Sequence, residues 1–199
     1  GKKIALAGAK NFKRISLELG GKNPSIICKD ASLNKASSVI ANDFTGNSGQ
    51  NCVAISRVYI DKYIYEDFKK RLIDQLNKYN FNQPLRDIKK QNFLKDYFRK
   101  NKLILKNNLV YGQLVNNSNI LKPLVFENIK ENHYLLKNEL FAPVLIMNKF
   151  NDLNELIETI NQSEYGLSGS LWTQNVKYGE QMLSKVESGR LWLNGSIFQ

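Results

Sequence analysis

Apolar residues recur every three to four positions in several stretches of the chain, with polar and charged residues between them. This spacing places the apolar side chains on one face of an α-helix. The clearest case is residues 63–79, where Ile64, Phe68, Leu72 and Leu76 lie four positions apart. On this basis helices are predicted at residues 1–16, 31–46, 63–79, 88–102, 152–166 and 176–187.

Short apolar runs bounded by Gly, Pro, Asn or Ser separate these helical stretches and predict β-strands. Such runs lie at residues 15–19, 25–28, 57–60, 109–115, 124–126, 143–147, 167–173 and 190–193. Strands that alternate with helices indicate an α/β fold with a mostly parallel sheet flanked by helices. Asp30 is predicted to cap the helix that begins at Ala31. No repeat or linker divides the chain.

Composition narrows the class of protein. The chain has 199 residues and 42% hydrophobic content, enough for one substantial core. Its 29 basic and 18 acidic residues give a net charge of +11, but the basic residues are scattered along the chain. We therefore expect no nucleic-acid partner, because such proteins concentrate their basic residues in a patch or stripe. No apolar run approaches the ~20 residues that span a membrane, so no membrane association is expected.

The chain contains two cysteines and one histidine. A structural zinc site uses four Cys or His ligands at short spacings, so no metal site is predicted. Two thiols in a chain of this length suit a reducing compartment, and we expect a cytoplasmic location. Cys28 lies inside a predicted strand, where a cysteine usually serves as a small buried apolar residue.

Three short motifs have residues suited to chemistry. Residues 47–52 (NSGQNC) present the Cys52 thiol after a Gly-Gln turn, and a thiolate is a strong nucleophile. The turn also leaves the Cys52 amide free to stabilise an oxyanion. Residues 17–24 (LELGGKNP) place Glu18 just before two glycines, where a carboxylate can act as a general base. Residues 139–143 (ELFAP) combine an acidic residue with an aromatic one.

In this order and at these spacings, the three motifs resemble the aldehyde dehydrogenase superfamily, and the resemblance covers nearly the whole chain. It implies that residues 1–20 are the end of a cofactor-binding domain and that residues 21–199 form the catalytic domain, with both chain ends truncated. The implied reaction is the oxidation of a small-molecule aldehyde to a carboxylic acid, with NAD or NADP as cofactor. A homo-oligomer is expected for the full-length protein.

The resemblance also implies a role for each catalytic residue. Cys52 would attack the aldehyde to form a thiohemiacetal, which passes a hydride to NAD(P)+ and becomes a thioester. Glu18 would activate the water that hydrolyses this thioester. Glu139 would bind the hydroxyl groups of the nicotinamide ribose, while Phe141 and Leu19 would complete the cofactor site.

Other positions extend or modify this match. Asn194 resembles a family asparagine near the substrate tunnel, although it would also suit a simple turn. Ala142 replaces the glycine that is usual in the family, so a shift of the local backbone is expected. Thr45 and Gly46 replace bulkier residues before the Cys52 motif and are expected to widen the tunnel.

Two alternatives remain open. A cysteine hydrolase would need a histidine base, for which His133 is the one candidate. The chain could instead be an inactive or split fragment of a dehydrogenase with only a folding or assembly role. By the resemblance, the glycine-containing loop for the cofactor pyrophosphate and the second oxyanion donor would precede Gly1. The isolated chain is therefore expected to be inactive.

Overall fold

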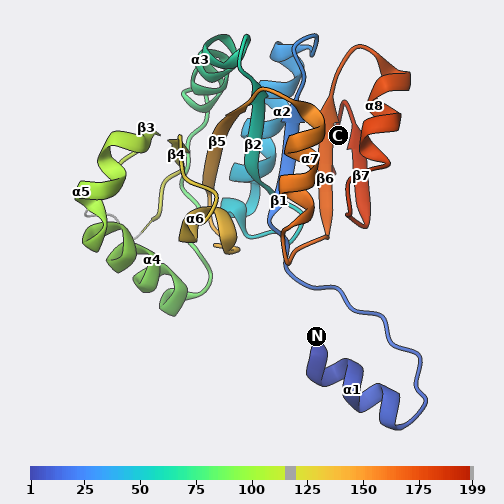
Figure 1. Cartoon of the computed structure of the whole chain (residues 1–199). Coiled ribbons are helices and arrows are strands. Elements are labelled where there is room, and N and C mark those ends of the chain that lie inside the picture. The colour runs from blue at the N-terminus through green and yellow to red at the C-terminus, as the bar shows by residue number, and fades with distance from the viewer. Residues whose placement is uncertain (115–119, 198–199) are drawn as a thin grey trace.

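A computed structural model describes residues 1–114 and 120–197 of the chain. Within these residues the strands form one seven-stranded sheet in the order β3-β4-β5-β2-β1-β6-β7, with helices packed on both faces (Figure 1). The strands are β1 (Asn23–Ile27), β2 (Ile55–Asp61), β3 (Leu109–Tyr111), β4 (Leu124–Glu127), β5 (Val144–Phe150), β6 (Ser168–Trp172) and β7 (Arg190–Leu193).

The helices join successive strands, and most are shorter than the sequence pattern suggested. They are α1 (Lys2–Lys10), α2 (Leu33–Thr45), α3 (Tyr65–Leu76), α4 (Ile88–Lys100), α5 (Lys102–Leu105), α6 (Tyr134–Lys137), α7 (Leu153–Asn161) and α8 (Val176–Leu183). Two short 3-10 helices, η1 (Gly46–Gly49) and η2 (Lys106–Asn108), complete the set.

The sheet is parallel except at one edge, where β3 runs antiparallel to β4. The predicted α/β fold with a mostly parallel sheet is therefore confirmed. In the register, Ile26 of β1 pairs with Tyr59 of β2 on one side and with Leu171 of β6 on the other. Because these strands are parallel, their amino ends share one edge of the sheet. The N-terminal segment enters β1 at that edge, at the bottom of the sheet in Figure 1.

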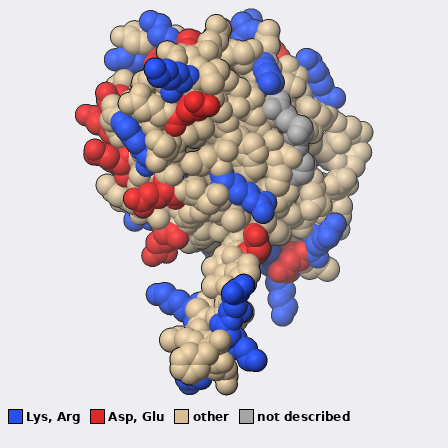
Figure 2. All heavy atoms as spheres, turned by 90° about the vertical axis from the view of Figure 1, so that its right-hand side faces the viewer, with Lys and Arg blue, Asp and Glu red and all other residues tan. Residues whose placement is uncertain are grey.

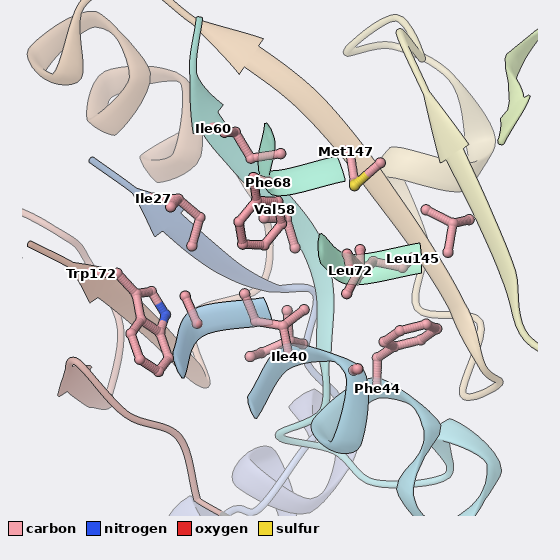
Figure 3. Close-up of a cluster of buried hydrophobic side chains, with 14 of the residues drawn as sticks. Ile27, Ile40, Phe44, Val58, Ile60, Phe68, Leu72, Leu145, Met147 and Trp172 are labelled. Carbon is pink, nitrogen blue, oxygen red and sulfur yellow. The ribbon is translucent and has the colours of Figure 1, made fainter. Parts of the chain in front are cut away.

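Alternate residues of the central strands face opposite layers of helices, as the two-residue period of a strand requires. Ile27 and Val58 belong to a fully buried cluster that includes residues of α2 and α3, such as Phe44 and Phe68 (Figure 3). Ile26 and Tyr59 face the opposite side, in a cluster with residues of α7 and α8. A third cluster joins α4, α5 and α6 to β4 and β5. Burying each such large apolar side chain contributes about 1.5–3 kcal/mol, which fixes the helices on the sheet.

Several sequence predictions need correction. Residues 15–19 form no strand, because none of the described strands pairs with this stretch; it runs as irregular chain from α1 to β1. The strand predicted at 109–115 ends at Tyr111, and Val115 lies outside the described residues. The helix predicted at 176–187 ends at Leu183.

Asp30 does not cap the helix that follows it. That helix begins at Leu33, with Ser32 at its N-cap position. The Asp30 carboxylate instead accepts hydrogen bonds from the Thr173 hydroxyl and from the backbone N–H groups of Gln174 and Asn175. It therefore ties the end of β1 to the end of β6. Asp152, in contrast, caps α7 as predicted, through Asn154 N and Glu155 N.

Residues 1–20 contribute no buried side chain, and burial begins at Gly21. In Figure 1 α1 lies apart from the sheet, and in Figure 2 the N-terminal segment protrudes with several basic side chains along it. On the face seen in Figure 2, further Lys and Arg are spread over the body and interspersed with acidic groups. The domain division at residue 20 stays a prediction.

Candidate active site

The candidate site forms around Gly20 and Gly21, where the chain enters β1. The Gly21 backbone N–H donates a hydrogen bond to Oε1 of Glu139, with an N···O distance of 3.2 Å. A Cβ added at Gly20 would lie 2.1 Å from Oε2 of Glu139, and one at Gly21 would lie 2.5 Å from the Cys52 carbonyl oxygen. Only glycine leaves room for both neighbours. The two glycines therefore let the motifs of Glu139 and Cys52 come together.

The loop that carries Cys52 has a strained backbone. Asn47, Ser48 and Gly49 all adopt positive φ angles, of 50°, 56° and 67°. Such angles cost little for glycine and are tolerated by asparagine, but they are unfavourable for serine. The hydroxyl of Ser48 donates to the Gln83 carbonyl oxygen at 2.6 Å, which helps to fix this conformation. Strain of this kind concentrates at functional loops.

Gln50 stabilises the same loop through hydrogen bonds to Asn47 and to Arg86. Its side chain donates to the Asn47 carbonyl oxygen at 2.9 Å, and Asn47 donates back to the Gln50 carbonyl oxygen at 3.0 Å. The Gln50 side-chain oxygen accepts the Arg86 N–H at 2.7 Å. Gly49 lies against Ala142, where an added Cβ would be 2.4 Å from the carbonyl carbon. The third motif therefore packs directly on the Cys52 loop.

Cys52 follows this loop at the amino end of β2 and is half-buried. Its Sγ lies 3.8 Å from Oδ1 of Asn51. Asn23 donates from Nδ2 to the carbonyl oxygens of Cys52 and Ala54, at 2.9 and 2.8 Å. These two hydrogen bonds fix the backbone from Cys52 to Ala54. Within the described residues the Cys52 amide makes no hydrogen bond, so it is available as an oxyanion donor.

Glu18 and Leu19 lie on the exposed chain just before Gly20 and Gly21. Oε1 of Glu18 is 3.9 Å from a guanidinium nitrogen of Arg190, and both side chains are more than half exposed. Leu19 is 50% exposed and lies beside Gly1. No hydrogen bond or ion pair joins Glu18 to Cys52 within the described residues. Glu18 nevertheless lies near the site, because the two residues of chain from Glu18 to Gly20 span at most about 7 Å.

Phe141 and Ala142 occupy a sharp turn beside the Cys52 loop. Phe141 is 39% exposed and adopts a φ of 51°, whereas Ala142 is buried and is not among the residues with positive φ. The methyl group of Ala142 is therefore compatible with its backbone conformation, and the strain falls on Phe141. The Glu139 N–H donates to the Tyr165 hydroxyl at 3.2 Å, which anchors the other side of this motif.

Asn194 lies elsewhere. It follows β7, and its amide makes two hydrogen bonds to the Thr173 backbone, 2.9 Å from N and 2.8 Å from O. Thr173 follows the carboxyl end of β6, whereas Cys52 lies at the amino edge of the sheet. A five-residue strand is about 17 Å long. The structure therefore uses Asn194 to close the end of the β6–β7 pair and does not bring it into contact with Cys52.

Lys22 is a site residue that the sequence reading missed. It is 1% exposed, and its Nζ has no hydrogen-bond partner within the described residues. Burial lowers the pKa of Lys22 to about 7; the nearby Arg57 cation lowers it further, while Glu139 acts in the opposite direction. Lysine is usually exposed, so its place between Gly20-Gly21 and the apolar run 25–28 was the one signal available in the sequence.

His133 is not positioned as a base for Cys52. It occupies the N-cap position of α6, where Nδ1 accepts the Leu135 N–H at 3.2 Å. Partial burial lowers the pKa of His133. Within the described residues no group of three His, Cys, Asp or Glu could bind a metal ion. No helix in that same part of the chain is long and apolar enough to cross a membrane.

The fold and this site define an α/β protein with a strained, cysteine-bearing loop at the amino edge of a parallel sheet. The sequence model described as the aldehyde dehydrogenase family matches residues 1–199. The chain therefore belongs to the aldehyde dehydrogenase family.

Individual relatives agree with this assignment. The chain is 31% identical to human retinaldehyde dehydrogenase 3 over 199 residues, which cover 94% of this chain and 39% of the relative. It is 31% identical to chicken aldehyde dehydrogenase 1A1, again over 94% of this chain and 39% of the relative. The chain thus spans about two fifths of the length of these relatives.

Solved structures give the same result. An NAD+ complex of an aldehyde dehydrogenase from Bacillus cereus is 32% identical with a TM-score of 0.87, covering 100% of this chain and 43% of that one. An NAD-dependent aldehyde dehydrogenase from Sinorhizobium meliloti is 29% identical with a TM-score of 0.88, covering 99% of this chain and 41% of that one.

Proposed function

We propose that the complete protein containing this chain oxidises an aldehyde to a carboxylic acid, with NAD+ or NADP+ as the hydride acceptor. Membership of the aldehyde dehydrogenase family supports this reaction class. The observation that carries the proposal is the position of Gly21. Its N–H donates to Glu139, and a Cβ at this position would lie 2.5 Å from the Cys52 carbonyl oxygen, so the proposed nucleophile and the proposed cofactor ligand both approach this one residue.

The first chemical step belongs to Cys52. Its thiolate adds to the carbonyl carbon of the aldehyde, forming a C–S bond and converting the carbonyl oxygen to an oxyanion. The Cys52 amide, which is not used within the described residues, donates to that oxyanion. Loss of a hydride from the same carbon then restores a carbonyl group and leaves a thioester on Cys52.

The second step belongs to Glu18. As a general base its carboxylate takes a proton from water, and the oxygen of that water attacks the thioester carbon. The C–S bond breaks, the Cys52 thiolate leaves with the bonding electrons, and the carboxylic acid is released. Glu18 lies on exposed chain just before Gly20 and Gly21, and its one polar contact within the described residues is a 3.9 Å exposed ion pair with Arg190, which its side chain can leave to approach the thioester.

The residues present fit a nicotinamide cofactor, whose ring accepts the hydride when bound. One oxygen of Glu139 accepts the Gly21 N–H, while Oε2 makes no hydrogen bond within the described residues. A carboxylate with a free oxygen suits the paired hydroxyls of a ribose. The partly exposed side chains of Phe141 and Leu19 supply apolar surface beside it. Asn194 is left out of these proposed steps, because its amide is already hydrogen-bonded to the Thr173 backbone.

The test uses the complete protein with a panel of aldehydes and either NAD+ or NADP+. We expect formation of the reduced cofactor with at least one aldehyde. In Glu18→Gln, hydride transfer should still occur once, giving a burst close to one equivalent per site before a slow phase. Glu158→Gln on α7, which removes an equally exposed carboxylate, should behave as the unmodified protein.

Two results would count against the proposal. Absence of cofactor reduction by the folded protein with every aldehyde would favour the inactive-fragment alternative. A Glu18→Gln variant with an unchanged steady-state rate would remove Glu18 from the mechanism.

A further inference from the structure

A second cavity lies at the edge of the sheet opposite Cys52. It has a volume of about 610 Å³, within the range of about 300–1,000 Å³ that is common for small-molecule sites. Its lining includes residues at or just after the carboxyl ends of four strands: Cys28 after β1, Asp61 in β2, Phe150 in β5 and Thr173 after β6. Cys52, in contrast, precedes β2 at the amino edge. The two sites are therefore separate.

The topology explains why a crevice forms there. The connection from β1 to β2 passes through α2, whose side chains join the cluster on one face of the sheet. The connection that leaves β6 passes through α8 to β7, and α8 belongs to the cluster on the other face. Because β1 and β6 are neighbours and the connections that leave them run to opposite sides, to β2 and to β7, these connections diverge between them. In open α/β sheets, ligands bind outside the carboxyl ends of strands at such a point.

The cavity has an acidic rim. Asp30, Asp61 and Asp152 line it together with one cation, Lys29. The Lys29 ammonium lies 4.8 Å from the centre of the Tyr63 ring, a cation–π contact that partly satisfies its charge. This local excess of carboxylates is notable in a chain with a net charge of +11.

Two of the three carboxylates retain a free oxygen. Oδ1 of Asp61 accepts the Tyr63 N–H at 2.9 Å, and Oδ1 of Asp152 accepts two N–H groups at the start of α7. Oδ2 of each makes no hydrogen bond or ion pair within the described residues. Asp30, which uses both oxygens on the segment 173–175, contributes charge alone.

The inner wall of the cavity is apolar. Cys28, Phe150 and Leu153 line it and belong to one buried hydrophobic cluster. Cys28 is only 8% exposed, and its thiol makes no hydrogen bond within the described residues. Burial raises the pKa of Cys28 to about 12, and the negative charges of Asp30 and Asp61 add to this effect. The Cys28 thiol is therefore uncharged and forms part of the apolar wall of the cavity. The phenol ring of Tyr178 is also part of the lining.

We propose that this cavity binds an organic ammonium ion, with the ammonium group between Asp61 and Asp152 and its apolar part against Cys28 and Phe150. A metal ion is a poorer fit, because no group of three acidic, His or Cys side chains within the described residues is arranged to bind one. An anion would be repelled by the three carboxylates. The proposal does not depend on the oxidation reaction at the opposite edge.

Butylammonium is a suitable probe, since it combines one ammonium group with a short apolar chain. Titration calorimetry on the complete protein should detect saturable binding, while butan-1-ol and butyrate at equal concentration should not bind. The Asp61→Asn and Asp152→Asn variants remove charge but keep an oxygen for the backbone hydrogen bonds, and Asn is a good helix N-cap. Each should weaken binding about tenfold, the typical effect of losing a charge-assisted hydrogen bond.

Asp74→Asn is the matched control, because Asp74 is an exposed carboxylate on α3 that is absent from the cavity lining. It should leave the affinity unchanged. Equal binding by the folded double variant Asp61→Asn/Asp152→Asn would overturn the proposal, as would an equal loss in Asp74→Asn. Displacement of butylammonium by stoichiometric Mg²⁺ or Ca²⁺ would also overturn it, because the site would then select a metal ion.

Discussion

The backbone N–H of Gly21 donates to the carboxylate of Glu139, a residue 118 positions further along the chain, across 3.2 Å. A Cβ on the same glycine would lie 2.5 Å from the carbonyl oxygen of Cys52. A single residue without a side chain thus fixes the spacing between a proposed nucleophile and a proposed cofactor ligand. This arrangement leads to predictions that can be checked without knowing the substrate.

A methyl group at Gly21 should damage the site. Gly21→Ala would place Cβ 2.5 Å from the Cys52 carbonyl oxygen, so the Cys52 loop must move. We expect a loss of about 1–3 kcal/mol in the free energy of unfolding, as for other overpacked buried positions. A displacement of about 1 Å should also lower aldehyde oxidation on the order of 100-fold. Urea unfolding and steady-state kinetics measure the two effects.

Gly46→Ala is the control, since nothing lies within 4 Å of a Cβ at Gly46 and its φ of −53° suits any residue. It should change stability by less than about 0.5 kcal/mol. If Gly21→Ala is as stable as Gly46→Ala and as active as the unmodified protein, Gly21 does not set the geometry of the site.

The two cysteines should react with thiol reagents at different rates. Cys52 is half-buried, whereas Cys28 is 8% exposed and has its pKa raised to about 12 by burial and by neighbouring carboxylates. At pH 8, only about one Cys28 thiol in 10⁴ would be a thiolate, and the thiolate is the reactive form. Iodoacetamide followed by peptide mass spectrometry should label Cys52 first. Equal labelling of the folded protein would contradict the structure around both thiols.

Lys22 should make stability depend on pH in a defined window. Its pKa is about 7 in the folded protein and 10.5 as the reference value, so unfolding takes up a proton between these pH values. The folded state is therefore penalised at and below pH 7, and the penalty disappears as pH rises toward 10.5. Lys22→Met, which removes the charge, should be more stable than the unmodified protein at pH 7. Between pH 7 and 9.5 this advantage should shrink by an amount on the order of 3 kcal/mol.

Urea unfolding at the two pH values measures this difference. Lys89→Met on the exposed side of α4 is the control and should change stability by less than about 0.5 kcal/mol at either pH. An advantage of Lys22→Met that stayed constant across the window would show that Lys22 is charged in the folded protein.

Much of the fold could be predicted from the sequence because its signals are local. The four-residue spacing from Ile64 to Leu76 predicted α3, and the apolar run after Pro143 predicted β5. Residues 15–19 showed the same local alternation but form no strand, because a strand also needs a neighbour. Asp30 had the right residue type for an N-cap, but Thr173 and the segment after it bind its carboxylate instead.

The site was harder to predict for the same reason. The motifs around Cys52 and Glu139 could be identified separately, but no sequence rule states that they meet at Gly21. Lys22 was given no role of its own within residues 17–24, and only the fold shows that it is buried. Asn194 matched a motif, yet the hydrogen bonds of its amide go to Thr173 at the other edge of the sheet.

The central claim is that Cys52 forms a covalent thioester during aldehyde oxidation, and the most direct measurement is the mass of the trapped intermediate. The complete protein with Glu18→Gln is mixed with aldehyde and NAD(P)+, quenched in acid and digested. The account predicts that the Cys52 peptide gains the mass of the aldehyde less two hydrogens, while the Cys28 peptide is unchanged. Cofactor reduction without this adduct, or an adduct on another residue, would contradict the account.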